Sequence, residues 1–121
     1  KDIRKSEKYL KPFFKLNKQR IILDKKLKIK VKLYFDKKNI CYEIVEPYGK
    51  NNPVDGFLKR GANILNHIAY TSKDFQSTLK FLKKNNFTQI TNINYSKVFK
   101  GKIVFLLSPL NYIVEIIEDS Q

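Results

Sequence analysis

The chain has 121 residues, a formal net charge of +14 and one cysteine. Its length suits one domain with its own hydrophobic core, whereas a lone cysteine excludes an internal disulfide and no apolar run reaches the ~20 residues of a membrane span. Only three of the 25 basic residues are arginine, the residue that phosphate and base contacts favour, and no DNA- or RNA-binding motif is present. We therefore expect a cytoplasmic protein with a lysine-solvated surface and with neither nucleic acid nor membrane as a partner.

The first half of the chain predicts one helix followed by strands. Residues 2–11 place apolar side chains on one side of a helix, with Asp2 as its N-terminal cap, and Pro12 should end or kink it. Three stretches with the composition of strands then follow, at residues 20–23, 27–35 and 40–46.

A turn-rich connector at residues 48–63 leads to the second half. Asn52-Pro53 and Gly61 predict the start and the end of a short helix over residues 54–60. The second half repeats the order of the first and adds a strand at its start. The predicted elements are a strand at 65–71, a helix at 74–85 capped by Asp74, and strands at 87–93, 102–107 and 112–117.

An offset of 72 residues relates the two halves without a gap. Corresponding segments are 1–3 and 73–75, 9–10 and 81–82, 31–33 and 103–105, and 43–46 and 115–118. We therefore predict two copies of one β-α-β-β-β module, of which the first lacks its opening strand. The expected fold is α+β, in a single domain over residues 1–121 with module one at 1–47, the connector at 48–63 and module two at 64–121.

The repeat singles out Glu43 and Glu115, which occupy equivalent positions in the two last strands. Alternation places each among apolar residues, where a carboxylate is costly unless it is paired or bound to a metal. The only histidine, His67, shares a strand face with the small Ala69, and one histidine with two glutamates suits a divalent transition metal. A hydrogen-bonded core histidine with solvated glutamates fits the same pattern, so spacing alone leaves both interpretations open. Cys41 shares the face of Glu43, and we expect a buried apolar thiol there.

Six segments carry a resemblance to a known family. They are YEIVEPYG at 42–49, NPV at 52–54 leading to FLKRG at 57–61, LNHIAY at 65–70, KIVFL at 102–106 and IVEIIE at 113–118. With these segments the chain resembles, over essentially its whole length, the vicinal oxygen chelate superfamily, above all its methylmalonyl-CoA epimerases and glyoxalase-like proteins.

This resemblance implies two modules that form a curved mixed sheet around a central cavity with a divalent transition metal, which would be Zn, Ni, Co, Mn or Fe. The ligands would be Glu43, His67 and Glu115, with a further histidine upstream of Lys1; because residue 1 is not methionine, we expect a longer natural chain. Glu115 would also act as the base that moves a proton alpha to a carbonyl. The implied protein is a homodimeric isomerase or lyase of glyoxalase or epimerase type with a small carbonyl or acyl-thioester substrate.

Two departures from the epimerase pattern keep a second interpretation open. Lys28, Ile29 and Lys30 stand where those epimerases carry an acidic residue, and the loop at 108–111 is shorter than theirs. The alternative is a non-catalytic small-molecule-binding protein of the same fold, with a resistance or accessory role. A basic nucleic-acid binder ranks last.

Overall fold

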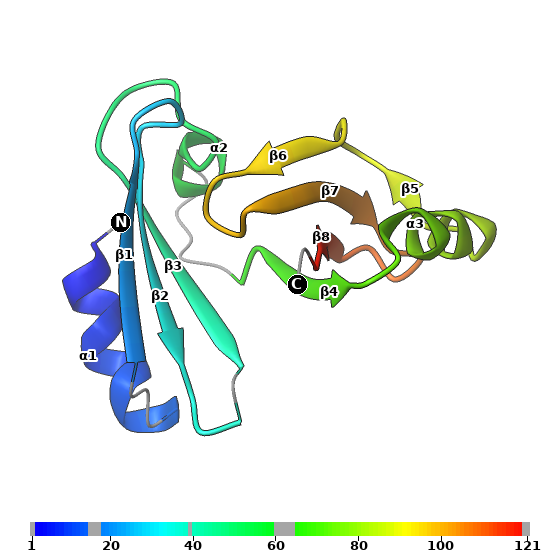
Figure 1. Ribbon diagram of the computed structural model, residues 1–121. Helices are drawn as coiled ribbons and strands as arrows, with labels where there is room; N and C mark the ends of the chain where they lie inside the picture. The colour runs from blue at the N-terminus through cyan, green and yellow to red at the C-terminus, as the bar shows by residue number, and fades with distance from the viewer. Residues whose placement is uncertain (1, 15–17, 39, 60–64, 120–121) are drawn as a thin grey trace. The chain divides into compact units, whose positions relative to one another are not determined.

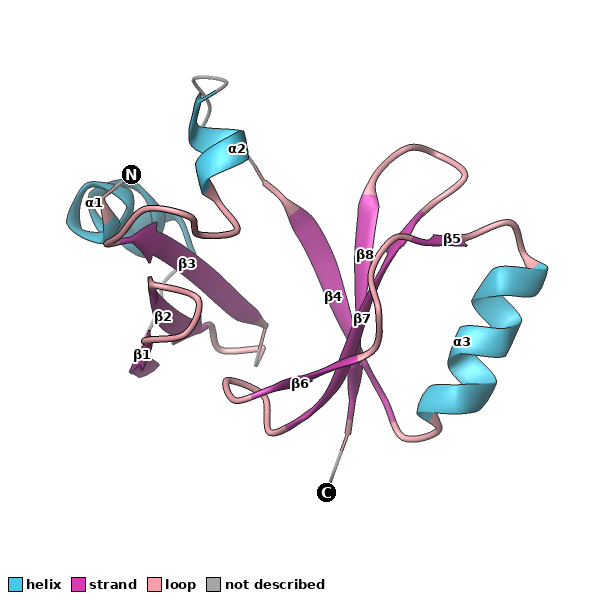
Figure 2. Cartoon of the chain, turned by 90° about the horizontal axis from the view of Figure 1, so that it is seen from above, coloured by secondary structure: helices cyan, strands magenta, loops and turns pink. Residues whose placement is uncertain are grey.

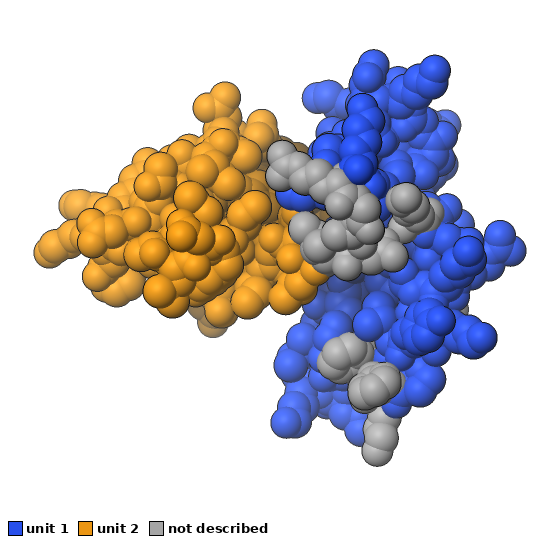
Figure 3. Space-filling view, turned by 180° about the vertical axis from the view of Figure 1, so that it is seen from behind, with its two compact units in different colours: residues 1–64 blue, residues 65–121 orange. Residues whose placement is uncertain are grey.

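The chain forms two compact units, residues 1–64 and residues 65–121 (Figures 1 and 3). The computed structural model describes residues 2–14, 18–38, 40–59 and 65–119. Each unit has its own helix and its own sheet, so the predicted α+β class is confirmed. The unit boundary lies close to the predicted start of module two. Among the described residues, no helix is long and apolar enough to cross a membrane.

Unit 1 is a helix followed by an antiparallel sheet and a second, short helix (Figure 1). Its strands have the order β1-β2-β3, with both pairs antiparallel. The three predicted strands are confirmed with small shifts of their ends, and the end predicted at Gly61 for the short helix lies outside the described residues. The elements are α1 Ile3–Phe14, β1 Lys18–Asp24, β2 Ile29–Phe35, β3 Cys41–Pro47 and α2 Asp55–Lys59.

The first helix begins where the sequence predicts but ends later. The Asp2 carboxylate accepts a hydrogen bond from the backbone N–H of Arg4 at 2.8 Å, as an N-terminal cap does. However, α1 continues past Pro12; of the two predicted outcomes, an end or a kink at Pro12, the end is therefore wrong. Pro12 lacks the N–H that would bond the carbonyl of Lys8, and Lys8 is exposed, so water can satisfy that carbonyl.

Unit 2 has the predicted β-α-β-β-β order, with its second strand split into two pieces. The strand order is β4-β8-β7-β5, and β6 also pairs with β7. β4 and β8 are parallel while the other pairs are antiparallel, so the sheet is mixed as predicted. The elements are β4 His67–Ser72, α3 Phe75–Lys84, β5 Thr88–Gln89, β6 Asn94–Ser96, β7 Gly101–Leu107 and β8 Ile113–Glu118.

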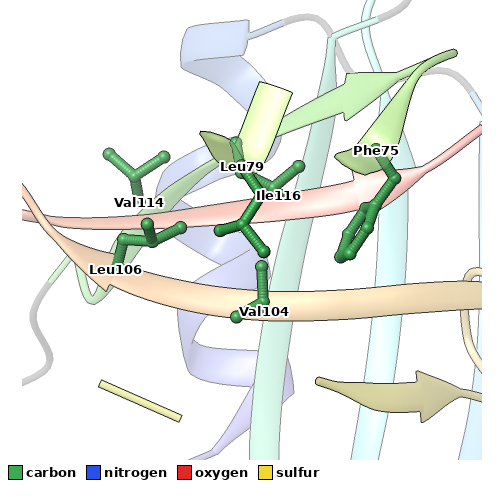
Figure 4. Packing of buried hydrophobic residues seen from close by; sticks show 6 residues of the cluster. All are labelled: Phe75, Leu79, Val104, Leu106, Val114 and Ile116. Atoms are coloured by element: carbon green, nitrogen blue, oxygen red, sulfur yellow. The ribbon is translucent and has the colours of Figure 1, made fainter. Parts of the chain in front are cut away.

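The core of each unit lies between its long helix and one face of its sheet. In unit 1, Ile3 of α1 packs with Tyr34 and Ile44 of the sheet. In unit 2, α3 lies along one side of the sheet (Figure 2), and its N-terminus is capped by Asp74, as predicted. The opposite face of each sheet is therefore not covered by the long helix of its own unit. The buried residues of the unit 2 core, shown in Figure 4, are Phe75, Leu79, Val104, Leu106, Val114 and Ile116.

The offset of 72 residues extends to the register of the strands. Leu33 lies opposite Glu43 in the β2–β3 pair, and Phe105 lies opposite Glu115 in the β7–β8 pair. Every residue pair of the β7–β8 ladder has its counterpart in the β2–β3 ladder at the same offset. The repeat predicted from the sequence is thus present in the backbone pairing, which gives the two glutamates equivalent positions within these two strand pairs.

The single strand predicted at residues 87–93 is wrong, because only the short strand β5 lies within that range and β6 begins just after it, at Asn94. Thr91 lies between them, and its Oγ1 accepts a hydrogen bond from the backbone N–H of Phe105 at 3.0 Å. The carbonyl of Thr91 accepts instead from the side-chain amide of Gln89 at 2.7 Å. Side chains that bond the backbone locally compete with the ladder, and this competition interrupts the strand.

Candidate functional site

Both predicted glutamates lie on the sheet face opposite the helix. In β8, Val114 and Ile116 belong to the core beneath α3, so strand alternation turns Glu115 to the other face. In β3, Ile44 packs with α1, and the same alternation turns Glu43 away from that helix. Each carboxylate therefore occupies the face on which a site could be built without disturbing the helix packing.

The structure brings together two of the three predicted ligands. His67 is the first residue of β4, and the parallel pairing of β4 with β8 places Ala69 directly beside Glu115. Nε2 of His67 lies 3.1 Å from Oε2 of Glu115. Glu115 is only 2% exposed, and a carboxylate in such a place requires a compensating partner.

Two side chains that the sequence analysis did not single out hold the imidazole of His67. Oδ1 of Asn66 lies 2.8 Å from Nδ1 of His67. The ring of Phe105 meets the imidazole edge to face, with 5.1 Å between centroids and 85° between planes. Asn66 directly precedes the histidine and Phe105 lies opposite Glu115, so both signals were present; residue spacing does not say which side chains reach the ring.

Glu43 is half-buried in β3, opposite Leu33. It belongs to unit 1, and its convergence with His67 and Glu115 stays a prediction. Cys41 shares its strand face but is exposed as the first residue of β3, so the prediction of a buried thiol is wrong. Partial desolvation of the sulfur and, second, the charge of Glu43 raise the pKa of Cys41 to about 11. Little thiolate forms at neutral pH, which makes Cys41 a poor nucleophile.

The donor atoms of unit 2 fit part of a metal site. Imidazole nitrogen and carboxylate oxygen both bind divalent transition metals. Two ligand atoms that each lie ~2 Å from one metal are roughly 3 Å apart, and His67 Nε2 and Glu115 Oε2 are separated by 3.1 Å. Within the described part of the chain, no group of three or more His, Cys, Asp or Glu side chains gathers as a metal site. Unit 2 thus offers a pair of ligands, and the third remains a prediction.

A hollow of about 340 Å³ in unit 1 lies on the helix side of the sheet, on the opposite face from Glu43. Its lining mixes the charges of Arg4, Lys30 and Glu46. Oε2 of Glu46 accepts a hydrogen bond from the N–H of Ile3 at 2.6 Å, so a carboxylate already occupies the N-terminal end of α1. Glu46 therefore has a structural role in attaching the helix to the sheet.

No model of a known protein family matches the chain, and no curated protein matches its sequence. Solved structures share its fold. The hypothetical protein BH1468 from Bacillus halodurans C-125 is 18% identical with a TM-score of 0.83, over 99% of this chain and 88% of that chain. A methylmalonyl-CoA epimerase is 12% identical with a TM-score of 0.79, over 99% and 89% of the two chains. The methylmalonyl-CoA epimerase of Mycobacterium tuberculosis is 11% identical with a TM-score of 0.78, over 99% and 82%.

Proposed function

We propose that this chain, which has the fold of the vicinal oxygen chelate superfamily, is a metal-dependent isomerase or lyase of glyoxalase or epimerase type. It would move a proton on the carbon alpha to a carbonyl. The substrate would be a small carbonyl compound or an acyl thioester. Two structures of the same fold are methylmalonyl-CoA epimerases by name, and their name supports the acyl-thioester class.

The observation that carries this proposal is the approach of His67 Nε2 to Glu115 Oε2, at 3.1 Å and at a buried position. Two atoms that both offer lone pairs repel each other at this distance unless a proton or a metal cation lies between them. A proton would make an inert ion pair, whereas a metal would make both groups its ligands. We favour the metal because the repeat supplies Glu43, a further carboxylate at the equivalent position of unit 1.

Each residue would have one task. His67, Glu115 and Glu43 would hold the metal, whose positive charge would stabilise a carbonyl oxygen that becomes negative as the alpha proton leaves. Glu115 would accept that proton, because a carboxylate shielded from water can act as a general base on carbon. Phe105 covers the imidazole from one side and would keep water from the ring.

A second candidate is a small-molecule-binding protein without catalysis, and the start of β2 favours it. Lys30 lies opposite Glu46 and faces the helix side of the sheet. On the glutamate face the corresponding position is Ile29, which is apolar and 7% exposed. A two-base epimerase needs a second acid or base near the substrate. The start of β2 does not supply one, so one-base chemistry or plain binding fits better there.

Deuterium exchange separates these candidates. Protein purified without added metal would be analysed for bound metals, loaded with Co²⁺ and incubated in D₂O with methylmalonyl-CoA or with the hemithioacetal of methylglyoxal and glutathione. We expect deuterium at the alpha carbon of one substrate, detected by mass spectrometry. Metal binding without exchange on either substrate would favour the binding protein, and failure to bind any divalent metal would contradict metal dependence.

Two glutamate variants of strand β8 provide a test and its matched control. Glu115→Gln should abolish exchange, because the amide neither accepts the proton nor binds the metal well. Glu118→Gln changes the same residue type on the opposite face of β8, where Glu118 bonds Lys102 at 2.9 Å, and it should leave exchange intact. We also propose a homodimer in the cytoplasm, and sedimentation analysis of the same preparations would measure its mass.

A further inference from the structure

Ala69 presents a single methyl group on the face of the unit 2 sheet that carries the candidate ligands. The parallel pairing of β4 with β8 sets Ala69 directly beside Glu115. Because side chains alternate along a strand, Ala69 also shares its face with His67, two positions earlier in β4. A small side chain therefore adjoins both members of the pair whose atoms Nε2 and Oε2 lie 3.1 Å apart.

Solvent reaches this face of the sheet at Ala69. Around Glu115, the strand pairing places Ala69 and Phe105 on the two neighbouring strands. Alternation places Ile113 and Ile117 on the same face of β8, two positions to either side of the glutamate. Of these four neighbours only Ala69 is exposed, whereas Glu115 itself is 2% exposed. The opening at Ala69 thus lies beside a carboxylate that its other three neighbours help to shield.

We propose that Ala69 is a specificity-determining residue, whose small side chain leaves the opening through which a substrate reaches His67 and Glu115. This role rests on the proposed function, because a carbon that gives its proton to Glu115 must lie close to that carboxylate. The opening itself is a property of the chain alone. It can therefore be measured without a metal or a substrate.

The neighbours of Ala69 in β4 limit the size of the group that can enter. His67 and Thr71 flank Ala69 on the same strand face, and each lies about 6.5 Å away along the strand. A space bounded in this way suits a reacting carbon with small substituents. Both proposed substrates fit this limit, since the carbon bears a methyl group and a carboxylate in methylmalonyl-CoA and a hydroxyl group beside the sulfur in the hemithioacetal. A larger side chain at position 69 would take the place of these groups.

Chemical modification of the imidazole tests the opening in the metal-free protein. Diethyl pyrocarbonate acylates histidine, and the ultraviolet absorbance of the product reports His67 alone because it is the only histidine. Ala69→Val adds two methyl groups and should slow this modification several-fold relative to wild type, whereas Ala69→Gly should react at least as fast as wild type. An equal rate in wild type and Ala69→Val would overturn the proposal. Valine suits a strand, and circular dichroism would verify the fold of each variant.

Deuterium exchange on the Co²⁺-loaded protein tests the role in specificity. In Ala69→Val the exchange rate should fall by roughly 10-fold or more, because one misplaced methylene in a pocket is worth about 10- to 200-fold. Its Co²⁺ affinity should stay close to that of wild type, because a single ion needs less room than a substrate. The matched control is Ile68→Phe, which enlarges a 43% exposed side chain on the opposite face of the same strand. This control should change neither the modification rate nor the exchange rate.

The outcomes separate this inference from the proposed function. If wild type neither binds Co²⁺ nor exchanges deuterium while Ala69→Val still slows the modification of His67, the opening at Ala69 stands and the proposed function fails. If wild type exchanges deuterium and Ala69→Val does so equally fast, the proposed function stands and the role of Ala69 is wrong. A loss of Co²⁺ affinity as large as the loss of exchange would mean that Ala69 acts on the metal and not on the substrate, which would also overturn its role in specificity.

Discussion

The two units place a glutamate at the same point of equivalent strand pairs, β2–β3 and β7–β8. Among the described strands, only the glutamate strand of unit 2 pairs with a further strand on its other side, β4. Glu115 lies between Phe105 of β7 and Ala69 of β4 and is buried. Glu43 lies opposite Leu33, at the edge of the three-stranded order β1-β2-β3, and is half-buried. The comparison shows what an opening strand contributes in this module: it buries the carboxylate and brings the histidine that faces it.

On the helix side of the two sheets, it is unit 1 that has charged side chains where unit 2 has apolar ones. In unit 2, Leu79 of α3 and Val104 of β7 share one apolar cluster. At the offset of 72 residues their counterparts are Glu7 of α1 and Lys32 of β2, which form an ion pair with side chains only 14% and 13% exposed. Unit 1 thus replaces an apolar contact between helix and sheet with a charged one, and the same backbone plan accommodates both.

The largest expected effect is a loss of metal affinity when either of the two equivalent glutamates is replaced. Glu43→Gln and Glu115→Gln should each lower Co²⁺ affinity by at least about 100-fold in calorimetric titration, because the loss of a mere outer partner already costs roughly 10- to 100-fold. Glu118→Gln serves as the control. Wild-type Co²⁺ affinity in Glu43→Gln would show that the metal site lies in unit 2 alone and that Glu43 does not share the ligand role of Glu115.

Replacing the ion pair of unit 1 by the side chains of unit 2 gives the next largest effect. Glu7→Leu alone should destabilise the fold by about 2 kcal/mol, because it leaves Lys32 largely buried without its partner; the cost stays below the ~3–5 kcal/mol of fully buried pairs since a lysine can extend toward water. The double variant Glu7→Leu/Lys32→Val should regain wild-type stability within about 1 kcal/mol. Urea unfolding measures both.

The i,i+4 neighbour Lys11 is the control for this cycle. Its Nζ lies 3.9 Å from Glu7 and its side chain is 48% exposed, so Lys11→Ala should change stability by less than about 0.5 kcal/mol. A double variant that remains as unstable as Glu7→Leu would show that the helix–sheet packing of the two units is not interchangeable.

The features that could be predicted from the sequence are those that depend on residue spacing along the chain. The repeat predicted that Glu43 and Glu115 occupy equivalent positions, and alternation predicted that each turns to one face of its strand, because side chains alternate with a period of two. The register, with Leu33 opposite Glu43 and Phe105 opposite Glu115, came only from the structure. The contacts of Asn66 and Phe105 with the imidazole of His67 could not be predicted, since they depend on side-chain rotamers. The rule that proline ends a helix likewise placed the end of α1 too early, because the carbonyl of exposed Lys8 can bond water in place of the missing donor.

A smaller effect on stability is expected at the interruption between β5 and β6. Unit 1 has no such interruption, because the equivalent strand β1 is continuous. Thr91→Val removes the hydroxyl that accepts from the N–H of Phe105 and should cost about 1–2 kcal/mol, the usual range for a part-buried donor left unsatisfied. Thr91→Ser keeps the hydroxyl and should stay close to wild type. Hydrogen exchange at the Phe105 amide gives a local measure; unchanged protection in Thr91→Val would mean that another acceptor serves this donor.

The smallest effect concerns the helix cap of unit 2. The hydrogen bond from the backbone N–H of Ser77 lowers the pKa of Asp74 below its ordinary value of 3.8. A carboxyl whose pKa is depressed by folding stabilises the native state fully above its unfolded pKa, and this stabilisation is lost as the pH falls through the folded pKa. Asp74→Asn keeps an accepting oxygen but does not titrate, so it should lack this acid-dependent loss while remaining a good cap at neutral pH. Thermal unfolding of both proteins between pH 2 and pH 7, in roughly half-unit steps, should show their difference changing only in the acid range; a constant difference at every pH would mean that the Asp74 charge does not contribute to the cap.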